Sequence, residues 1–158
     1  LISNLNLEIV RIEEEIDKTI SSDPSMSKNF KLVKSVKGIG KINAYFLIAY
    51  TANFTMFKNG RTFACYCGIA PFESSSGNFN GKPRVNPLAN KKIKALLNMA
   101  AVSVISAKGE HKEYYNRRVE NGKSKMSTLN IIRNKLVHRV FAVVHRGTPY
   151  VDLYKFAA

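Results

Sequence analysis

The chain of 158 residues lacks several features that define common protein classes. It has no tryptophan and only two cysteines, Cys65 and Cys67, which are too few for a structural zinc site and too close together for an unstrained disulfide. No apolar run approaches the roughly 18 to 20 residues that span a bilayer. Acidic residues interrupt the first 20 positions, so no signal peptide is expected, and no initiator methionine opens the chain. We therefore expect a fragment with free thiols and no membrane partner.

Acidic residues are also scarce and unevenly placed. The chain holds 25 Lys and Arg against 11 Asp and Glu, a formal net charge of +14. Residues 1–23 carry two bases and six acids, whereas residues 24–158 carry 23 bases and five acids. A hydrophobic content of 45% excludes a disordered basic tail. The composition thus predicts an acidic segment followed by a folded basic domain with a polyanionic partner.

The acidic segment has the spacing of a helix. Apolar residues recur at steps of three and four, as in a heptad seam, at Ile2, Leu5, Ile9, Ile12 and Ile16. The helix is expected to end at the polar turn around Asp23-Pro24. It is either the end of a coiled-coil linker that pairs protomers in a homo-oligomer, or an amphipathic helix packed on its own domain. The domain boundary is accordingly placed between residues 23 and 24.

A glycine-rich turn follows between two apolar stripes, at residues 30–36 and 44–51. Two short helices joined by Gly38-Ile39-Gly40 have the pattern of a helix-hairpin-helix motif. Gly38 and Gly40 would let the backbone approach a phosphate, and the next helix would offer its free N–H groups. Lys37 and Lys41 add charge for a DNA backbone. The alternative is an ordinary helical hairpin with a glycine turn.

A second candidate phosphate site follows the polar residues 73–85, which predict a loop or short β-hairpin. The helix expected over 87–107 carries Lys91, Lys92 and Lys94 in its first turns, although cations there oppose the helix dipole. A phosphate partner would make this charge favourable. Lys82 and Arg84 in the preceding segment complete the expected nucleic-acid-binding set. The fold class is therefore mainly α, with a helix-hairpin-helix, a short β-hairpin or loop, and a coiled-coil-like helix before them.

The C-terminal part predicts two more helices, divided at Asn121-Gly122. The three histidines are far apart in the sequence and do not form a metal-binding set, so no metal ligand is expected in this chain. Tyr114 and Tyr115 lie beside two arginines, and we interpret them as packing aromatics rather than as recombinase nucleophiles.

The order of these motifs resembles one known family. Three segments of the chain resemble the C-terminal transposase domain of the Piv-like insertion-sequence transposases: VKGIGKINAYFLIAY, FKNGRTFACYCGIAPFESSSG and KIKALLNMAAVSV. These are site-specific DNA recombinases guided by a bridge RNA, with an RuvC-like N-terminal domain. The resemblance covers residues 32–150, most of the chain.

The resemblance implies that Ser76, before Gly77, is the catalytic serine, with Ser75 and Ser74 as alternatives. It would attack a DNA phosphodiester and hold the strand as a phosphoserine. Mg²⁺ would be bound by four acids of the RuvC-like domain, which is absent from this chain, so no cofactor is expected here and the fragment is expected to be inactive alone. The implied partners are double-stranded DNA and a guide RNA, in the bacterial cytoplasm with the nucleoid.

Two rival functions fit the same composition. One is a non-catalytic helix-hairpin-helix DNA-binding module, and the other is a protein that binds structured RNA, since electrostatic attraction does not separate RNA from DNA. Substitution of Ser76 by alanine distinguishes the first rival from a recombinase, and preference for an A-form duplex would identify the second.

Overall fold

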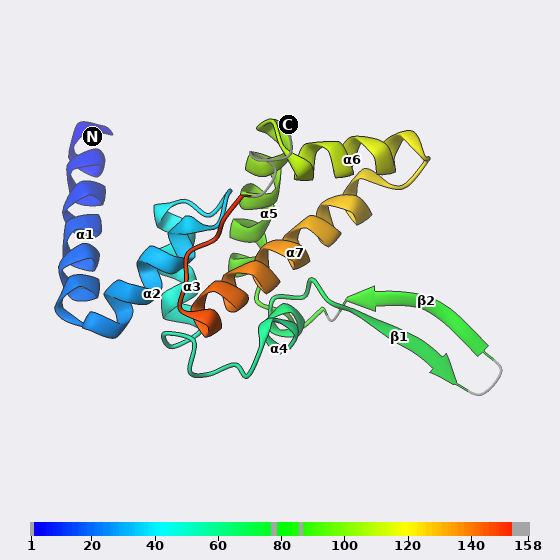
Figure 1. Cartoon of the computed structure of the whole chain (residues 1–158), viewed down its shortest axis with the longest axis horizontal. Coiled ribbons are helices and arrows are strands. Elements are labelled where there is room, and N and C mark those ends of the chain that lie inside the picture. The colour runs from blue at the N-terminus through cyan, green and yellow to red at the C-terminus, as the bar shows by residue number, and fades with distance from the viewer. Residues whose placement is uncertain (1, 77–78, 86, 153–158) are drawn as a thin grey trace.

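The computed structural model describes residues 2–76, 79–85 and 87–152; of residues 73–76 and 79–84 it describes the backbone alone. The described part is a helical body from which one helix and one β-hairpin project (Figure 1). In chain order the elements are α1 (Ile2–Ser22), α2 (Pro24–Ser35), α3 (Lys41–Tyr50), α4 (Gly60–Tyr66), β1 (Pro71–Ser76), β2 (Phe79–Val85), α5 (Lys91–Ser106), α6 (Glu110–Glu120) and α7 (Lys125–Arg146). The predicted mainly helical fold with a short β-hairpin is confirmed.

Helix α7 is the centre of the body. It packs against α2, α4, α5 and α6, while α3 packs against α2 and α5. Its buried stripe includes Ile132, Leu136 and Val140, which are 1% exposed or less. Phe63 of α4 is fully buried and lies in edge or tilted contact with Phe57 and Phe141. Aromatic pairs of this kind add roughly 0.5–1.5 kcal/mol each beyond burial, so they hold α4 against α7.

Local capping explains where several helices begin and end. The Asp23 carboxylate accepts hydrogen bonds from the N–H groups of Ser25 and Met26, and Pro24 occupies the first helical position of α2. Asn59 and Thr62 form a reciprocal capping box at α4. Helix α7 ends at Gly147, which has a φ of 70°. Helix α6 ends at Glu120, with Asn121 as its C-cap and Gly122 at a φ of 73°. The helix breaks predicted at Asp23-Pro24 and Asn121-Gly122 are therefore confirmed.

The β-hairpin, named the arm, consists of β1 and β2. The strands pair antiparallel from Pro71 opposite Val85 at the base to Ser76 opposite Phe79 at the far end, with an irregularity between Phe72 and Ser74. No third strand joins them within the described residues. The arm projects away from the helical body in Figure 1. At about 3.3 Å per residue, Ser76 lies roughly 17 Å along the strand from Pro71.

Helix α1 stands at the other end of the molecule (Figure 1) and packs on α2. Its first half exposes the expected apolar seam: Ile2, Leu5, Ile9 and Ile12 are 54–76% exposed, whereas Ile20 is buried. The seam therefore packs on the body only at its C-terminal end, and the coiled-coil interpretation stays a prediction. None of the helices in the described ranges combines the length and the apolar character needed to cross a membrane.

Candidate nucleic-acid interface

The Gly38-Ile39-Gly40 turn connects α2 to α3 and packs against α5. Gly38 has a φ of +91°, and a Cβ built on it would overlap the Val104 side chain. No described atom lies within 4 Å of the Cβ position of Gly40. Packing against α5 therefore accounts for Gly38, whereas Gly40 is open and leaves the first N–H groups of α3 without a side-chain cap. The use of this turn as a phosphate-binding helix-hairpin-helix stays a prediction.

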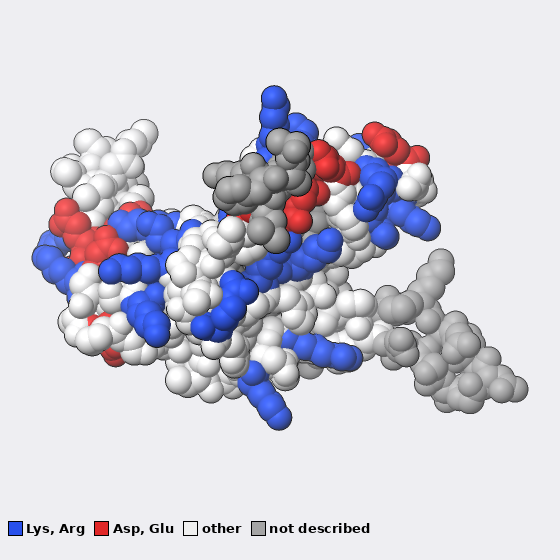
Figure 2. Space-filling view, in the orientation of Figure 1, with Lys and Arg blue, Asp and Glu red and all other residues white. Residues whose placement is uncertain are grey.

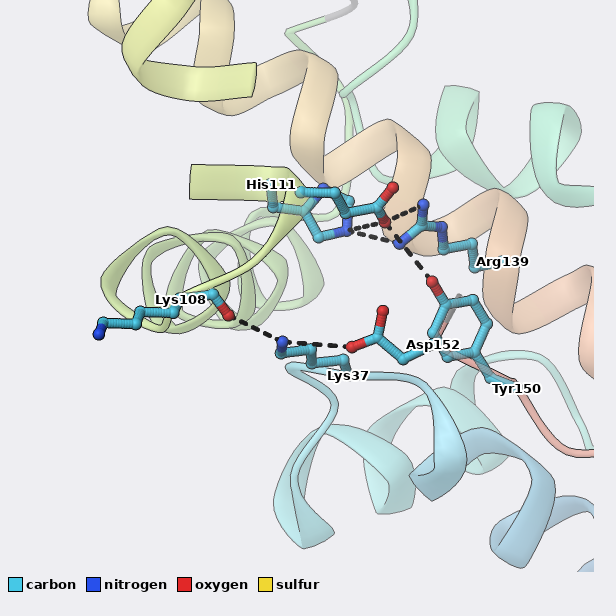
Figure 3. Close-up of polar contacts among 7 residues, drawn as sticks. Lys37, Lys108, His111, Arg139, Tyr150 and Asp152 are labelled. Atoms are coloured by element: carbon cyan, nitrogen blue, oxygen red, sulfur yellow. Dashed lines mark hydrogen bonds and ion pairs between the residues drawn. The ribbon is translucent and has the colours of Figure 1, made fainter. Parts of the chain in front are cut away.

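Lys37, next to this turn, lies in a polar cluster that joins three parts of the chain (Figure 3). Its ammonium group lies 3.3 Å from the Asp152 carboxylate and donates a 2.9 Å hydrogen bond to the carbonyl of Lys108. The side chain is 36% exposed. The lysine thus ties the turn to the α5–α6 connection and to the C-terminal segment, and its charge is partly neutralised.

Lys41, the first residue of α3, is held by the acidic helix α1. Its ammonium group lies 2.8 Å from an Asp17 oxygen and 3.4 Å from a Glu13 oxygen, and Tyr45 donates a 2.5 Å hydrogen bond to Asp17. Hydrogen bonding to Lys41 and Tyr45 lowers the pKa of Asp17, and hydrogen bonding to Asp17 raises the pKa of Lys41. Two carboxylates therefore occupy the side of Lys41 that faces α1.

The start of α5 has the opposite arrangement. The Asn90 side chain accepts hydrogen bonds from the N–H groups of Lys92 and Ile93, so the first-turn N–H groups are partly used. Lys91 and Lys92 are exposed and Lys94 is half-buried, and no described carboxylate forms an ion pair with any of the three. A phosphate at this helix start would be bound by ammonium groups.

The two candidate phosphate sites are far apart. Gly38 packs at Val104, 13 residues beyond Lys91 on the same helix. At 1.5 Å per residue this corresponds to about 20 Å along α5. The start of α5 instead lies at the base of the arm, where the Asn90 N–H donates to the carbonyl of Tyr66 and the Asn90 amide to the Tyr66 hydroxyl. The structure thus brings the α5 lysines next to the arm and separates both from the glycine turn.

The arm carries the predicted nucleophile. The backbone of Ser74, Ser75 and Ser76 forms the outer part of β1, and that of Lys82 and Arg84 lies in β2. The structure describes the backbone of these five residues but not their side chains, and it does not describe Gly77. The choice among the three serines therefore stays a prediction.

Two clusters of polar and charged side chains on α6 and α7 were not predicted from the sequence. In the first, His111 is 4% exposed; Arg139 donates a 2.7 Å hydrogen bond to its Nε2 atom and also pairs with Glu110. Arginine has no acceptor, so the imidazole accepts and is neutral. Burial, followed by the charge of Arg139, lowers the pKa of His111. The contact joins residues 28 apart, and no local motif predicts it.

The second, named the Tyr114 cluster, consists of Tyr114, Arg117, Arg118 and Lys135. The Lys135 ammonium lies 3.8 Å from the Tyr114 ring centroid, and the guanidinium groups of Arg118 and Arg117 lie 5.7 and 5.9 Å from it. The pair of tyrosines beside two arginines was the available signal for this cluster. Tyr114 and Tyr115 do pack against the hydrophobic core, as predicted, but the contact of the Tyr114 ring with three cations was not predicted.

Basic side chains form separate groups over the face in Figure 2, over α2, α7 and the α6–α7 turn, while acidic side chains gather beside α1 and beside α6. The described ranges contain no group of three or more His, Cys, Asp or Glu side chains placed to hold a metal ion.

Comparison with known proteins adds the family context. A family model described as Transposase IS116/IS110/IS902 family matches residues 30–116. An "Insertion element IS110 uncharacterized 43.6 kDa protein" of Streptomyces coelicolor is 24% identical over 139 residues, which are 88% of this chain and 33% of that protein. A "Probable family 20 transposase" of Pseudomonas aeruginosa is 23% identical over 153 residues, 94% of this chain and 44% of that protein. The chain therefore spans between a third and just under half of the length of these relatives.

Proposed function

This chain belongs to the IS116/IS110/IS902 family of transposases, and from that premise we propose that it binds DNA and presents a serine for strand cleavage. The observation that carries the proposal is the position of the arm. A strand ending in Ser74, Ser75 and Ser76 projects from the body, and the exposed lysines of α5 lie at its base. Phosphate binding by Lys91 and Lys92 would hold the DNA backbone alongside the arm.

In the proposed step, the Oγ atom of Ser76 forms a bond to a DNA phosphorus atom. The bond from phosphorus to the leaving deoxyribose oxygen breaks, and the strand is held as a phosphodiester of serine. The serine proton must pass to a base, and the leaving oxygen must gain a proton. The cleaved bond is exchanged for one of the same kind, so the strand can later be rejoined to a different end.

In this proposal the base comes from another domain. His111 is buried against Arg139, and its Nε2 atom accepts from that guanidinium. Mg²⁺ would supply charge stabilisation at the phosphate and is expected to be bound by acids of another domain. The site would then be composite, with the serine and phosphate contacts from this chain. A guide RNA as an additional partner is part of the same proposal.

Helix α1 supports a proposal about assembly. Its exposed apolar seam at Ile2, Leu5, Ile9 and Ile12 has heptad spacing, and the N-terminal part of α1 projects beyond the body (Figure 1). We propose that the matching helix of a second copy covers this seam, which would pair two domains for recombination.

Alanine substitution of Ser74, Ser75 and Ser76, one at a time in a full-length transposase that carries this domain, tests the function. One of the three variants should lose strand exchange completely while its DNA affinity stays within about twofold, because the hydroxyl acts in chemistry rather than in phosphate binding. The other two serve as matched controls. Strand exchange by all three variants would leave the non-catalytic DNA-binding module as the function of this domain.

A further inference from the structure

The outer face of helix α3 is apolar although it is exposed to solvent. The helix, KINAYFLIAY, has Lys41 as its single charged residue. Ala44 and Leu47 are buried in the core, whereas Ile42 is 43% exposed and Phe46 is 36% exposed. A helix at the surface of a globular protein normally has polar side chains on its outer face. An apolar outer face therefore indicates contact with another molecule.

Aromatic rings extend this face from α3 to α4. The Phe46 ring stacks on Tyr50, with centroids 5.9 Å apart and an interplanar angle of 18°. Tyr50 in turn lies in tilted contact with Tyr66 of α4, with centroids 6.5 Å apart. We name these three residues the aromatic row. Its two end members, Phe46 and Tyr66, are 36% and 38% exposed, so each presents ring surface to solvent.

The Tyr66 end of the aromatic row meets the start of α5. The Asn90 N–H donates a 3.0 Å hydrogen bond to the Tyr66 carbonyl, and the Asn90 amide donates a 2.9 Å hydrogen bond to the Tyr66 hydroxyl. Lys91 and Lys92 follow Asn90 directly; both are exposed, and none of the described carboxylates forms an ion pair with them. Exposed rings and ammonium groups are therefore neighbours on this surface.

This combination identifies the kind of molecule that fits the face. An apolar protein surface would cover the rings but offer no counter-charge to the ammonium groups. A nucleic-acid strand offers both, because its bases stack on aromatic rings and its phosphates bind cations. A duplex cannot use the rings, since its base faces are stacked on one another and only base edges, sugars and phosphates face outward. The aromatic row therefore fits a strand with unpaired bases.

We propose that the aromatic row binds unpaired bases of the DNA strand beside the cleavage site, with the phosphates of that strand on Lys91 and Lys92. The inference rests on the proposed function and deepens it, because it names the form of DNA that this face binds. A strand that is cleaved and rejoined to a different end must leave its complement, so its bases become unpaired. The start of α5 lies at the base of the arm, where such a strand would emerge.

A fluorescent reporter tests the stacking directly. The chain contains no tryptophan, so Phe46→Trp introduces a single indole ring into the aromatic row. Stacking of a base on an indole ring quenches its fluorescence. A 20-nucleotide oligo-dT strand should quench the Phe46→Trp variant, whereas a 20-base-pair DNA duplex should not. The matched control is Phe30→Trp, which replaces a half-buried ring of α2 that stacks on Tyr45, and neither DNA should quench it.

Fluorescence anisotropy of the same labelled DNAs measures the effect on affinity. Phe46→Leu keeps an apolar side chain but removes the ring, so it should weaken binding of the single strand about fivefold or more while duplex affinity changes less than about twofold. Phe46→Tyr keeps a ring and should bind the single strand within about twofold of the unmodified chain. Phe30→Leu is the matched control and should change neither affinity by more than about twofold. Thermal melting confirms that each variant is folded.

Absence of quenching of Phe46→Trp by the single DNA strand would overturn the inference, and so would equal losses of affinity in Phe46→Leu and Phe30→Leu. Quenching by a 20-nucleotide oligo-U strand but not by oligo-dT would assign the aromatic row to RNA, and the proposed DNA strand would be wrong.

The proposed function fails in a different way. If the unmodified chain bound neither duplex nor single-stranded DNA at any salt concentration, the proposed DNA binding and the aromatic row would both be wrong. If Lys91→Gln with Lys92→Gln weakened duplex binding while Phe46→Leu left single-strand binding unchanged, DNA binding would stand and the aromatic row alone would be rejected.

Discussion

Helices α3 and α5 begin with the two lysine-rich turns that are candidates for phosphate binding, and they are built in opposite ways. At α3 no side chain caps the first N–H groups, but Lys41 is held by Asp17 and Glu13. At α5 Asn90 caps the first turn, but Lys91 and Lys92 are exposed and form no ion pair with a described carboxylate. The α3 start therefore offers uncapped backbone N–H groups beside a cation paired with carboxylates. The α5 start offers partly capped N–H groups beside cations that pair with no described carboxylate.

The difference shows that a lysine beside a helix start is not necessarily available to a phosphate. Carboxylates from distant parts of the chain decide its availability: Asp152 for Lys37, and the acidic helix α1 for Lys41. Residues 24–158 hold five acids against 23 bases, so the acids of this domain are too few to pair with most of its lysines and arginines. We therefore expect phosphate affinity to be greater at the start of α5 than at the start of α3.

The largest expected effect is on stability, at the glycine turn. Gly38→Ala places a Cβ against Val104 at a positive φ, so it should lower the free energy of unfolding by about 3 kcal/mol. Gly40→Ala is the matched control and should change it by less than about 1 kcal/mol, because its Cβ would meet nothing within 4 Å. Urea unfolding measures both. Equal losses would mean that the turn is not packed on α5, whereas partial rescue by Val104→Ala would confirm the contact.

A smaller effect is expected from releasing Lys41. Substitution of Glu13 by Gln together with Asp17 by Asn removes both carboxylates from the α3 start, so DNA affinity should rise several-fold and its salt dependence should steepen. The control pair, Glu8→Gln with Glu14→Gln, makes the same change in net charge on exposed positions of α1 that do not touch Lys41. If both pairs raised affinity equally, only net charge would matter and the α1 contact would have no role in binding.

The smallest effect concerns His111 and the cluster beside Lys37. The pKa of His111 is lowered in the folded chain, mainly by burial and next by the charge of Arg139. The unfolded chain therefore binds a proton at this histidine more readily than the folded chain does. The free energy of unfolding should therefore be greatest above the unfolded pKa near 6.5 and should fall as the pH drops below that value. The charged groups that act on the imidazole are Arg139, Glu110, Lys135 and Lys37, and of these Arg139 and Glu110 contact it. Thermal melting between pH 7.5 and 5 should show this slope, and His111→Gln should flatten it; an unchanged slope would exclude His111 as its source.

Local chemistry explains what could be predicted from the sequence. Asp23 with Pro24 and Asn121 with Gly122 mark helix ends through their own capping and turn geometry, so those boundaries were predictable. The partners of Lys37 and Lys41 were not, because Asp152 and Glu13 lie 115 and 28 residues away. Gly38 illustrates the same limit. In the sequence, a glycine needed because a Cβ would overlap Val104 cannot be told from a glycine that lets the backbone approach a phosphate.

The most direct test of the difference between the two helix starts is DNA binding by two double variants across a salt series. Lys91→Gln with Lys92→Gln should lower the slope of log K against log salt by about 1.8, two phosphate contacts, and Lys37→Gln with Lys41→Gln should lower it by less than half of that. Both variants lose two charges, so net charge cannot explain a difference between them. A larger loss of slope in the Lys37 and Lys41 variant would place the phosphates at the glycine turn and contradict the assignment to α5.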